Sequence, residues 1–147
     1  MKTQYFGEDK LSEIEYKLRK GAYAIILNSN YDLATVRSPR GNVLPGGALE
    51  GNENFKEALE REVLEEIGFE ITMKDLIGTY GQYILASKQK EYYELLGNFY
   101  ICELNALVNY ESEEELELEW IKKEDIDKKL NLDYQLHAVL EVLKNKL

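Results

Sequence analysis

The stretch GALEGNENFKEALEREVLEEIGF, Gly47–Phe69, determines how the rest of this 147-residue sequence is interpreted. Asn54 followed three residues later by Glu57 is typical of a capping box, a set of reciprocal side-chain and backbone hydrogen bonds that begins a helix. Gly68 suits the left-handed conformation that commonly ends one. The stretch therefore predicts a helix over residues 54–67.

Three glutamates of this predicted helix, Glu62, Glu65 and Glu66, stand three and four positions apart, where like charges repel by a few tenths of a kcal/mol per pair. At about 100° per residue, two of these carboxylates fall in one row with two apolar side chains, in the order Phe55, Leu59, Glu62 and Glu66. An ordinary solvated charge face would lie opposite the apolar residues. The helix pattern alone therefore does not decide whether the three glutamates form a solvated face or a ligand site.

The whole stretch resembles the signature of the Nudix hydrolases. That signature is Gly, five residues, Glu, seven residues, Arg-Glu, an aliphatic residue, any residue, Glu-Glu, any residue, Gly and an apolar residue. Every defined position is met, by Gly47, Glu53, Arg61, Glu62, Val63, Glu65, Glu66, Gly68 and Phe69. The preceding LPGG, Leu44–Gly47, is also usual in the family. One departure is Asn42, where many members carry a tryptophan, and this weakens inferences about that part of the substrate pocket.

The resemblance implies an α/β (α+β) fold: an α/β/α sandwich with a mixed β-sheet between helices, formed by residues 1–147 as a single domain. It implies that the metal ligands are Glu62, Glu65 and Glu66, one of which also serves as the base, with the Gly46 carbonyl as a further ligand. Glu53 would support the site from nearby, and Arg61 would orient a carboxylate or hold the loop. We expect the Arg61 and Glu62 side chains to diverge, because adjacent helix positions do not face each other.

The chemistry of the glutamates agrees with this resemblance. Clustered carboxylates without a nearby His or Cys are hard oxygen ligands, which suit Mg²⁺ or Mn²⁺. Such an ion can bind pyrophosphate oxygens, neutralise charge that develops on them and activate water. The expected function is metal-dependent hydrolysis of the pyrophosphate bond in a nucleoside diphosphate linked to another group.

Two alternatives belong to other functional classes. A Nudix-fold module that senses nucleotides without turnover often has an eroded signature, whereas this one is intact. A related fold that isomerises a prenyl diphosphate would be expected to carry additional His and Cys residues in its site. This chain has one of each, His137 and Cys102, both far from the signature. We expect His137 to be a bystander and Cys102 to be a small buried residue of a strand.

Other residues are candidates for the site. Arg37 and Arg40, in the Gly- and Pro-rich loop before the signature, could pair with substrate phosphate or simply face solvent. Family members often recruit one more glutamate from a later region, for which Glu114 and Glu115 are the candidates. Four tyrosines could stack on a base or pack in the protein: Tyr80, Tyr83, Tyr92 and Tyr93.

Strands are predicted on both sides of the helix. We expect them at Glu13–Arg19 (with a short helix as the alternative), Gly21–Asn28, Leu33–Val36, Leu76–Ala86, Tyr93–Leu104 and Glu114–Ile121. In the last of these, alternation puts one set on a common face: Leu116, Leu118 and Trp120. A closing helix is indicated by a leucine stripe, Leu136, Leu140, Leu143 and Leu147.

Composition limits the class of protein and the kinds of partner that are expected. Apolar residues make up 44% and charged residues 31% of the chain, as in a soluble globular protein. No apolar run approaches the length of a membrane span. The formal charge of −10 argues against long nucleic acid and leaves a small nucleotide-type diphosphate as the expected partner. A single cysteine cannot form an internal disulfide, which fits a reducing cytoplasm. Homodimers are common in the family, so a homodimer is a further expectation.

Overall fold

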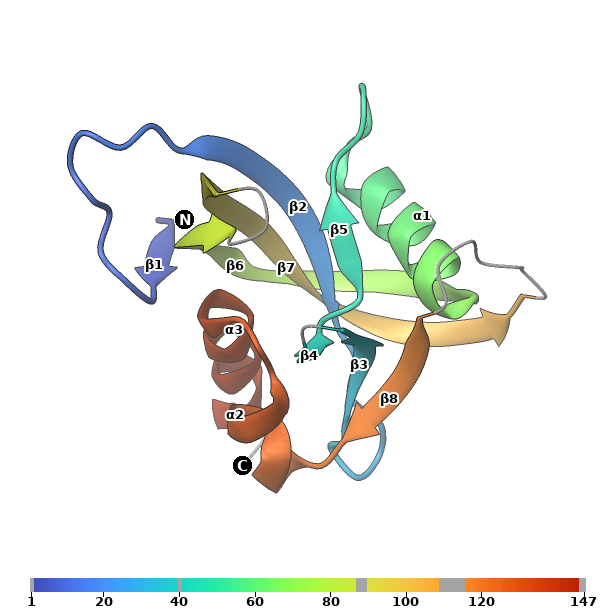
Figure 1. Ribbon diagram of the computed structural model, residues 1–147. Helices are drawn as coiled ribbons and strands as arrows, with labels where there is room; N and C mark the ends of the chain where they lie inside the picture. The colour runs from blue at the N-terminus through green and yellow to red at the C-terminus, as the bar shows by residue number, and fades with distance from the viewer. Residues whose placement is uncertain (1, 40, 87–89, 109–115, 146–147) are drawn as a thin grey trace.

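Two sheets and three α-helices form the molecule in the computed structural model, which describes residues 2–39, 41–86, 90–108 and 116–145 (Figure 1). Within these residues the larger sheet has five strands in the order β1-β6-β7-β2-β5. Their bounds are β1 Gln4–Phe6, β2 Lys17–Ile25, β5 Gly46–Ala48, β6 Phe69–Ala86 and β7 Glu91–Leu107. The smaller sheet has the order β4-β3-β8, with β3 Leu33–Ser38, β4 Gly41–Val43 and β8 Glu117–Ile121.

The helices lie on opposite faces of the larger sheet (Figure 1). Helix α1, Phe55–Ile67, covers one face next to β5, and α3, Asp133–Lys144, covers the other. Between β8 and α3 the chain forms a 3₁₀ turn, Lys123–Asp125, and a short helix α2, Ile126–Lys129. The β2 strand runs antiparallel to β5 and parallel to β7, so the sheet is mixed. This arrangement is the predicted α/β/α sandwich.

The core consists of two clusters because β2 is buried on both faces. Its small residues Ala22 and Ala24 join the cluster beneath α1, together with Leu59, Val63 and Cys102. On the other face, Ile25 packs with a cluster that includes Phe99, Tyr134 and Val139. Side chains alternate along a strand, so one segment supplies both layers. The alanines leave room for α1 to approach the sheet closely.

Helix α1 begins and ends as the sequence predicted. The Asn54 side chain accepts a hydrogen bond from the Glu57 backbone N–H (2.8 Å), and the Glu57 carboxylate accepts one from the Asn54 N–H (3.0 Å). Gly68 is left-handed, with φ 75°. The carboxylate row is also confirmed, since Leu59 is fully buried and Glu66 is only 8% exposed.

Several strand predictions need correction. A separate strand at Glu13–Arg19 is wrong: β2 begins at Lys17 and runs through Gly21, because nine consecutive residues pair with β7. The β6 strand begins at Phe69, directly after α1, and not at Leu76. Three strands of three residues each were not predicted: β1, β4 and β5.

One predicted core face is also wrong. On α3 the buried side chains are Tyr134, Gln135, Ala138, Val139, Val142 and Leu143, whereas Leu140 is 41% exposed. The sheet therefore receives a neighbouring face of the helix and not the full leucine stripe. On β8, Ile121 is buried, Leu118 packs against the cluster beneath α1, and Trp120 is 38% exposed. The predicted Leu147, Glu114, Glu115 and Arg40 lie outside the described residues. Among those that are described, no helix is long and apolar enough to cross a membrane.

Candidate active site

Arg61 connects α1 to the loop that follows β5. Its guanidinium donates two hydrogen bonds to the Glu53 carboxylate, from Nε (2.7 Å) and from Nη2 (2.9 Å). Nη2 also donates to the Ala48 carbonyl oxygen (3.2 Å). The hydrogen bond from Arg61, followed by one from the Glu50 N–H, lowers the pKa of the Glu53 carboxyl. Arg61 therefore holds the loop in place, which is one of the two roles that the sequence implied.

The expectation that Arg61 and Glu62 diverge is wrong. Arg61 Nη1 donates to Glu62 Oε1 (3.0 Å) and, one turn along, to Glu65 Oε2 (3.3 Å). Only the Cα–Cβ bonds of adjacent helix residues point apart. The guanidinium lies at the end of a long flexible stem and is drawn in by carboxylates on several sides. Arg61 thus contacts two of the three clustered glutamates, in addition to Glu53.

Two of the clustered glutamates, Glu62 and Glu66, lie against the glycines of β5. Glu66 Oε1 accepts a hydrogen bond from the buried Gly46 N–H (2.8 Å). The Glu62 carboxyl lies so close to Gly47 that a Cβ there would be 2.6 Å from Glu62 Cδ. At Gly46, with φ +137°, a Cβ would be 2.1 Å from the Ala22 carbonyl oxygen. A side chain at Gly46 would therefore clash with the backbone of the sheet, whereas one at Gly47 would displace the Glu62 carboxylate.

The donor set suits a hard divalent cation. Glu62, Glu65, Glu66 and the Gly46 carbonyl offer only oxygen, which Mg²⁺ and Mn²⁺ prefer. In the described part of the chain, no three acidic, histidine or cysteine side chains converge as a preformed cation site. The contacts explain this, because Arg61 holds Glu62 and Glu65 while Gly46 holds Glu66. The residues fit such an ion in the chemistry of their donor atoms, and Arg61 contacts two of them, Glu62 and Glu65.

A cavity of about 250 Å³ lies on the α3 side of the same glycines. Its walls include Gly46 and Gly47, apolar side chains such as Leu44 and Leu95, and a polar set that sequence reasoning missed: Arg19, Tyr23, Ser38, Asn131, Tyr134 and Gln135. No local motif marks these residues, since they come from β2, β3 and the segment around the start of α3. The four candidate tyrosines Tyr80, Tyr83, Tyr92 and Tyr93 are not among its lining residues.

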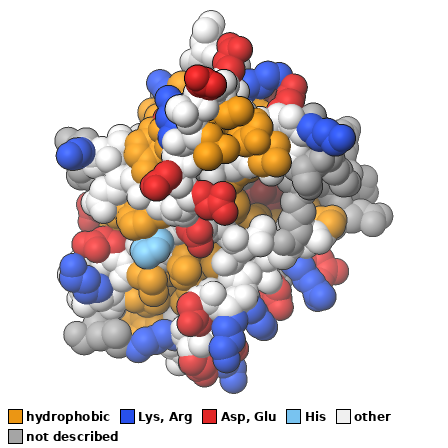
Figure 2. All heavy atoms as spheres, turned by 60° about the vertical axis from the view of Figure 1, so that its left-hand side comes forward, with side chains coloured by type: hydrophobic (Ala, Val, Ile, Leu, Met, Phe, Trp, Pro, Cys, Tyr) orange, Lys and Arg blue, Asp and Glu red, His pale blue; other side chains and the backbone are white. Residues whose placement is uncertain are grey.

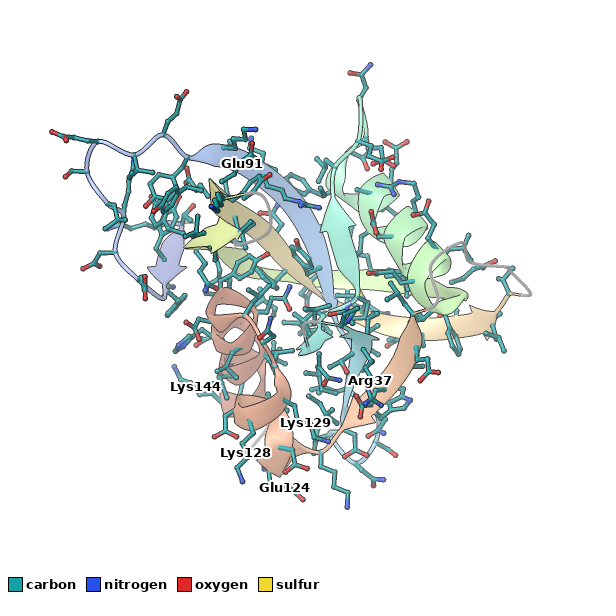
Figure 3. All side chains as sticks on the ribbon, in the orientation of Figure 1. Arg37, Glu91, Glu124, Lys128, Lys129 and Lys144 are labelled. Atoms are coloured by element: carbon teal, nitrogen blue, oxygen red, sulfur yellow. The ribbon has the colours of Figure 1, made fainter. Side chains whose placement is uncertain are left out.

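The predicted substrate arginine Arg37 does not line this cavity. It is exposed on β3, and Figure 3 shows it beside that strand, in a different part of the molecule from α1. Its neighbour Ser38 lines the cavity instead, because successive side chains on a strand point to opposite faces. Asn42 is buried as well and donates to Thr35 Oγ1 (2.9 Å) and Glu119 Oε2 (2.5 Å), so it links strands of the smaller sheet and is not part of the cavity wall.

The remaining predictions concern His137 and Cys102. The His137 ring stacks on Phe6, with 4.0 Å between ring centroids. Figure 2 shows the pale blue histidine side chain at the surface beside hydrophobic side chains. It is not among the residues that line the cavity. Cys102 is 3% exposed in β7, as predicted for a small buried residue.

Comparisons with known proteins agree with the fold. The family model described as "NUDIX domain" matches residues 17–141. A Bacillus subtilis (strain 168) protein named "Putative 8-oxo-dGTP diphosphatase" is 37% identical over 65 residues, an alignment that spans 42% of this chain and only 42% of that protein. The structure of a NUDIX hydrolase from Nitrosomonas europaea matches with a TM-score of 0.71 at 21% identity, covering 88% of this chain and 91% of that one. A MutT protein from Methanosarcina mazei Go1 matches with a TM-score of 0.66 at 22% identity, covering 92% and 100%.

Proposed function

The chain belongs to the NUDIX domain family, and we propose that it is a metal-dependent pyrophosphohydrolase acting on a nucleoside diphosphate linked to another group. One observation supports this most strongly. The two glycines that contact the Glu62 and Glu66 carboxylates also line the cavity. A substrate can therefore occupy the cavity with one part and present its diphosphate to the carboxylates with another.

Each protein group has a definite task in this proposal. Gly46 and Gly47 have no side chains, so a diphosphate can pass over this edge strand. The Gly46 N–H fixes the orientation of Glu66. Arg61 keeps the following loop against α1 through Glu53 and the Ala48 carbonyl. These contacts preorganise the site before substrate arrives, which is an important source of rate enhancement in enzymes.

Glu62, Glu65, Glu66 and the Gly46 carbonyl would hold the divalent ion. When bound, Mg²⁺ or Mn²⁺ would supply charge neutralisation at the pyrophosphate and a more acidic water as the nucleophile. The proposed substrate class has additional support in the name of the Bacillus subtilis relative, which refers to a nucleoside triphosphate.

A phosphate-release screen tests the proposal. Nucleoside triphosphates, nucleotide sugars and dinucleoside polyphosphates would be incubated with the protein and Mg²⁺, Mn²⁺ or excess chelator. We expect hydrolysis of at least one compound, complete loss of activity in chelator, and a loss of about a hundredfold or more in kcat in Glu66→Gln. Glu60→Gln is the matched control, because it removes a carboxylate of the same helix that pairs only with Lys56 (2.8 Å) among the described residues.

Full turnover in excess chelator would reject the metal mechanism. Tight binding of a nucleotide without any hydrolysis would instead support the sensing module.

A further inference from the structure

The cavity contains a cation that no motif identifies. Among its described lining residues, Arg19 is the one with a positive side chain. Arg61, the other arginine near the carboxylates, has its guanidinium committed to Glu53, Glu62 and Glu65. An anionic diphosphate entering a protein with a formal charge of −10 needs positive charge at its binding site. Arg19 is the residue that can supply it from the cavity side.

The register of β2 places Arg19 close to the edge strand. Gly21 pairs with Ala48 and Ala22 with Gly47, so Arg19 lies just beyond the end of β5. Arg19, Gly21 and Tyr23 share one face of β2 because side chains alternate. A Cβ on Gly21 would lie 2.8 Å from the Gly47 carbonyl oxygen and 2.9 Å from the Tyr23 hydroxyl. The absence of a side chain at Gly21 thus leaves room for both the Tyr23 hydroxyl and the Gly47 carbonyl on this face of β2.

Electrostatics agree with this placement. Burial raises the pKa of Tyr23, while a hydrogen bond with Tyr134 and the positive charge of Arg19 lower it. The negative charges of Glu66 and Glu62 raise it. The charges of Arg19 and of the two carboxylates therefore all act on the Tyr23 hydroxyl, and Tyr23 lines the cavity.

The Arg19 guanidinium is also available to bind a phosphate group. In the described part of the chain no hydrogen bond or ion pair engages it, whereas Lys17, two residues earlier on the same face, is paired with Glu91 at 2.7 Å. An arginine offers a planar fork of donors that matches two phosphate oxygens at once. An unpaired guanidinium at the wall of a substrate cavity has the chemistry of a phosphate ligand.

We propose that Arg19 binds the diphosphate group of the substrate from the cavity side of Gly47, opposite the carboxylates. This inference rests on the proposed function and adds a substrate-binding residue that lies outside the Gly47–Phe69 signature. The diphosphate is then bound from two sides of the edge strand. The carboxylates bind it through their ion on one side, and the Arg19 guanidinium binds it on the other.

The test uses methylenediphosphonate, a diphosphate analogue with a non-hydrolysable P–C–P link and no base, titrated into the full chain with Mg²⁺ by calorimetry. We expect Arg19→Gln to raise its Kd by about tenfold, since a hydrogen bond between charged groups is lost. Arg19→Lys should fall between the parent and Arg19→Gln, because charge remains but the fork is lost. Lys17→Gln, a matched exposed position on the same strand, should bind like the parent. Mg²⁺ affinity without the analogue should be the same in all four proteins.

Parental affinity of Arg19→Gln for methylenediphosphonate would overturn the inference, and so would failure of the parent to bind it. An equal loss in Lys17→Gln would overturn it too, by reducing the effect to general surface charge. The hydrolysis screen decides the proposed function separately. A parent that hydrolyses nucleotides while Arg19→Gln retains full affinity therefore rejects only the role of Arg19.

Discussion

At the residue scale, Glu66 serves two purposes that a single substitution cannot separate. Its carboxylate is proposed to hold a cation, and the same carboxylate accepts the buried Gly46 N–H. Leaving such a donor without an acceptor costs about 1–3 kcal/mol. A pair of substitutions can distinguish the structural contact from the charge.

We predict that Glu66→Gln folds as stably as the parent without metal, because the glutamine oxygen can still accept from Gly46 while one repulsive charge is removed. Glu66→Leu should lose about 1–3 kcal/mol of unfolding free energy. Both should lose most of the stabilisation that added Mg²⁺ gives the parent. Thermal melts with Mg²⁺ and with chelator measure all of these effects. A metal-free Glu66→Gln that melts well below the parent would show that the charge itself holds the fold.

Glu53 makes the stability of the folded protein depend on pH, in a direction that follows from its contact with Arg61. Arg61 lowers its pKa in the folded protein below the value of about 4.3 expected in the unfolded chain. The folded state then binds fewer protons, so this contribution to stability is complete above the unfolded pKa and is lost as the pH falls through the folded one. We predict that Glu53→Gln is less stable than the parent at pH 7 and that the gap narrows below about pH 4. Urea unfolding at pH 7, 5, 4 and 3 measures this, and a gap that stays constant would contradict it.

At the element scale, the edge strand β5 brings the sheet, the helix and the cavity together in three residues. Its two glycines are constrained by different partners: Gly46 by the backbone of β2, and Gly47 by the movable end of the Glu62 side chain. Backbone cannot give way cheaply, whereas a carboxylate can turn. The two positions should therefore respond differently to the same added methyl group.

We predict that Gly46→Ala loses more than about 3 kcal/mol of unfolding free energy or fails to fold, because it adds a backbone clash to a left-handed φ. Gly47→Ala should lose about 1 kcal/mol or less yet lower kcat strongly, since its methyl displaces Glu62. Urea unfolding and steady-state kinetics on the two variants provide the comparison. Normal kcat in Gly47→Ala would show that Glu62 need not occupy this position.

The same scale shows which elements a sequence can reveal. Helix α1 was predictable because its signals are local: the Asn54–Glu57 capping box, the terminal Gly68 and the apolar row. The strand β5, Gly46–Ala48, is defined by its pairing with β2. Three residues are too few to show a periodic pattern in the sequence. On α3 the choice between the leucine stripe and the neighbouring face of Tyr134, Ala138 and Val142 depends on which side meets the sheet.

At the scale of the whole molecule, two buried glutamines join α3 to other elements, Gln135 from the helix itself and Gln82 from β6. Gln135 Oε1 accepts the Leu44 N–H (2.9 Å) two residues before the first glycine of β5, and Gln82 Oε1 accepts the Tyr134 N–H (3.0 Å) at the start of the helix. The site could be predicted only in part for this reason. The carboxylates are adjacent on one helix, but Arg19, Leu44 and Gln135 meet only once the topology is complete.

We predict that Gln135→Leu loses about 1–3 kcal/mol of unfolding free energy, because the Leu44 N–H is left without its acceptor. Its KM should also rise, since Leu44 and Gln135 line the cavity. Leu140→Ala is the matched control on the same helix and should change both quantities little, as Leu140 is 41% exposed. A larger stability loss in Leu140→Ala than in Gln135→Leu would restore the leucine stripe as the buried face.

The burial of Cys102 gives the protein a built-in reporter of core opening. It is the only thiol in the chain, and burial raises its pKa to about 12. Alkylating reagents react with the thiolate and need access to it, so the closed molecule should remain unmodified at neutral pH. Each molecule can gain at most one adduct, and it does so only after β7 has separated from the layer beneath α1. The rate at which a single mass increment appears therefore measures how often this half of the core opens, without any engineered label.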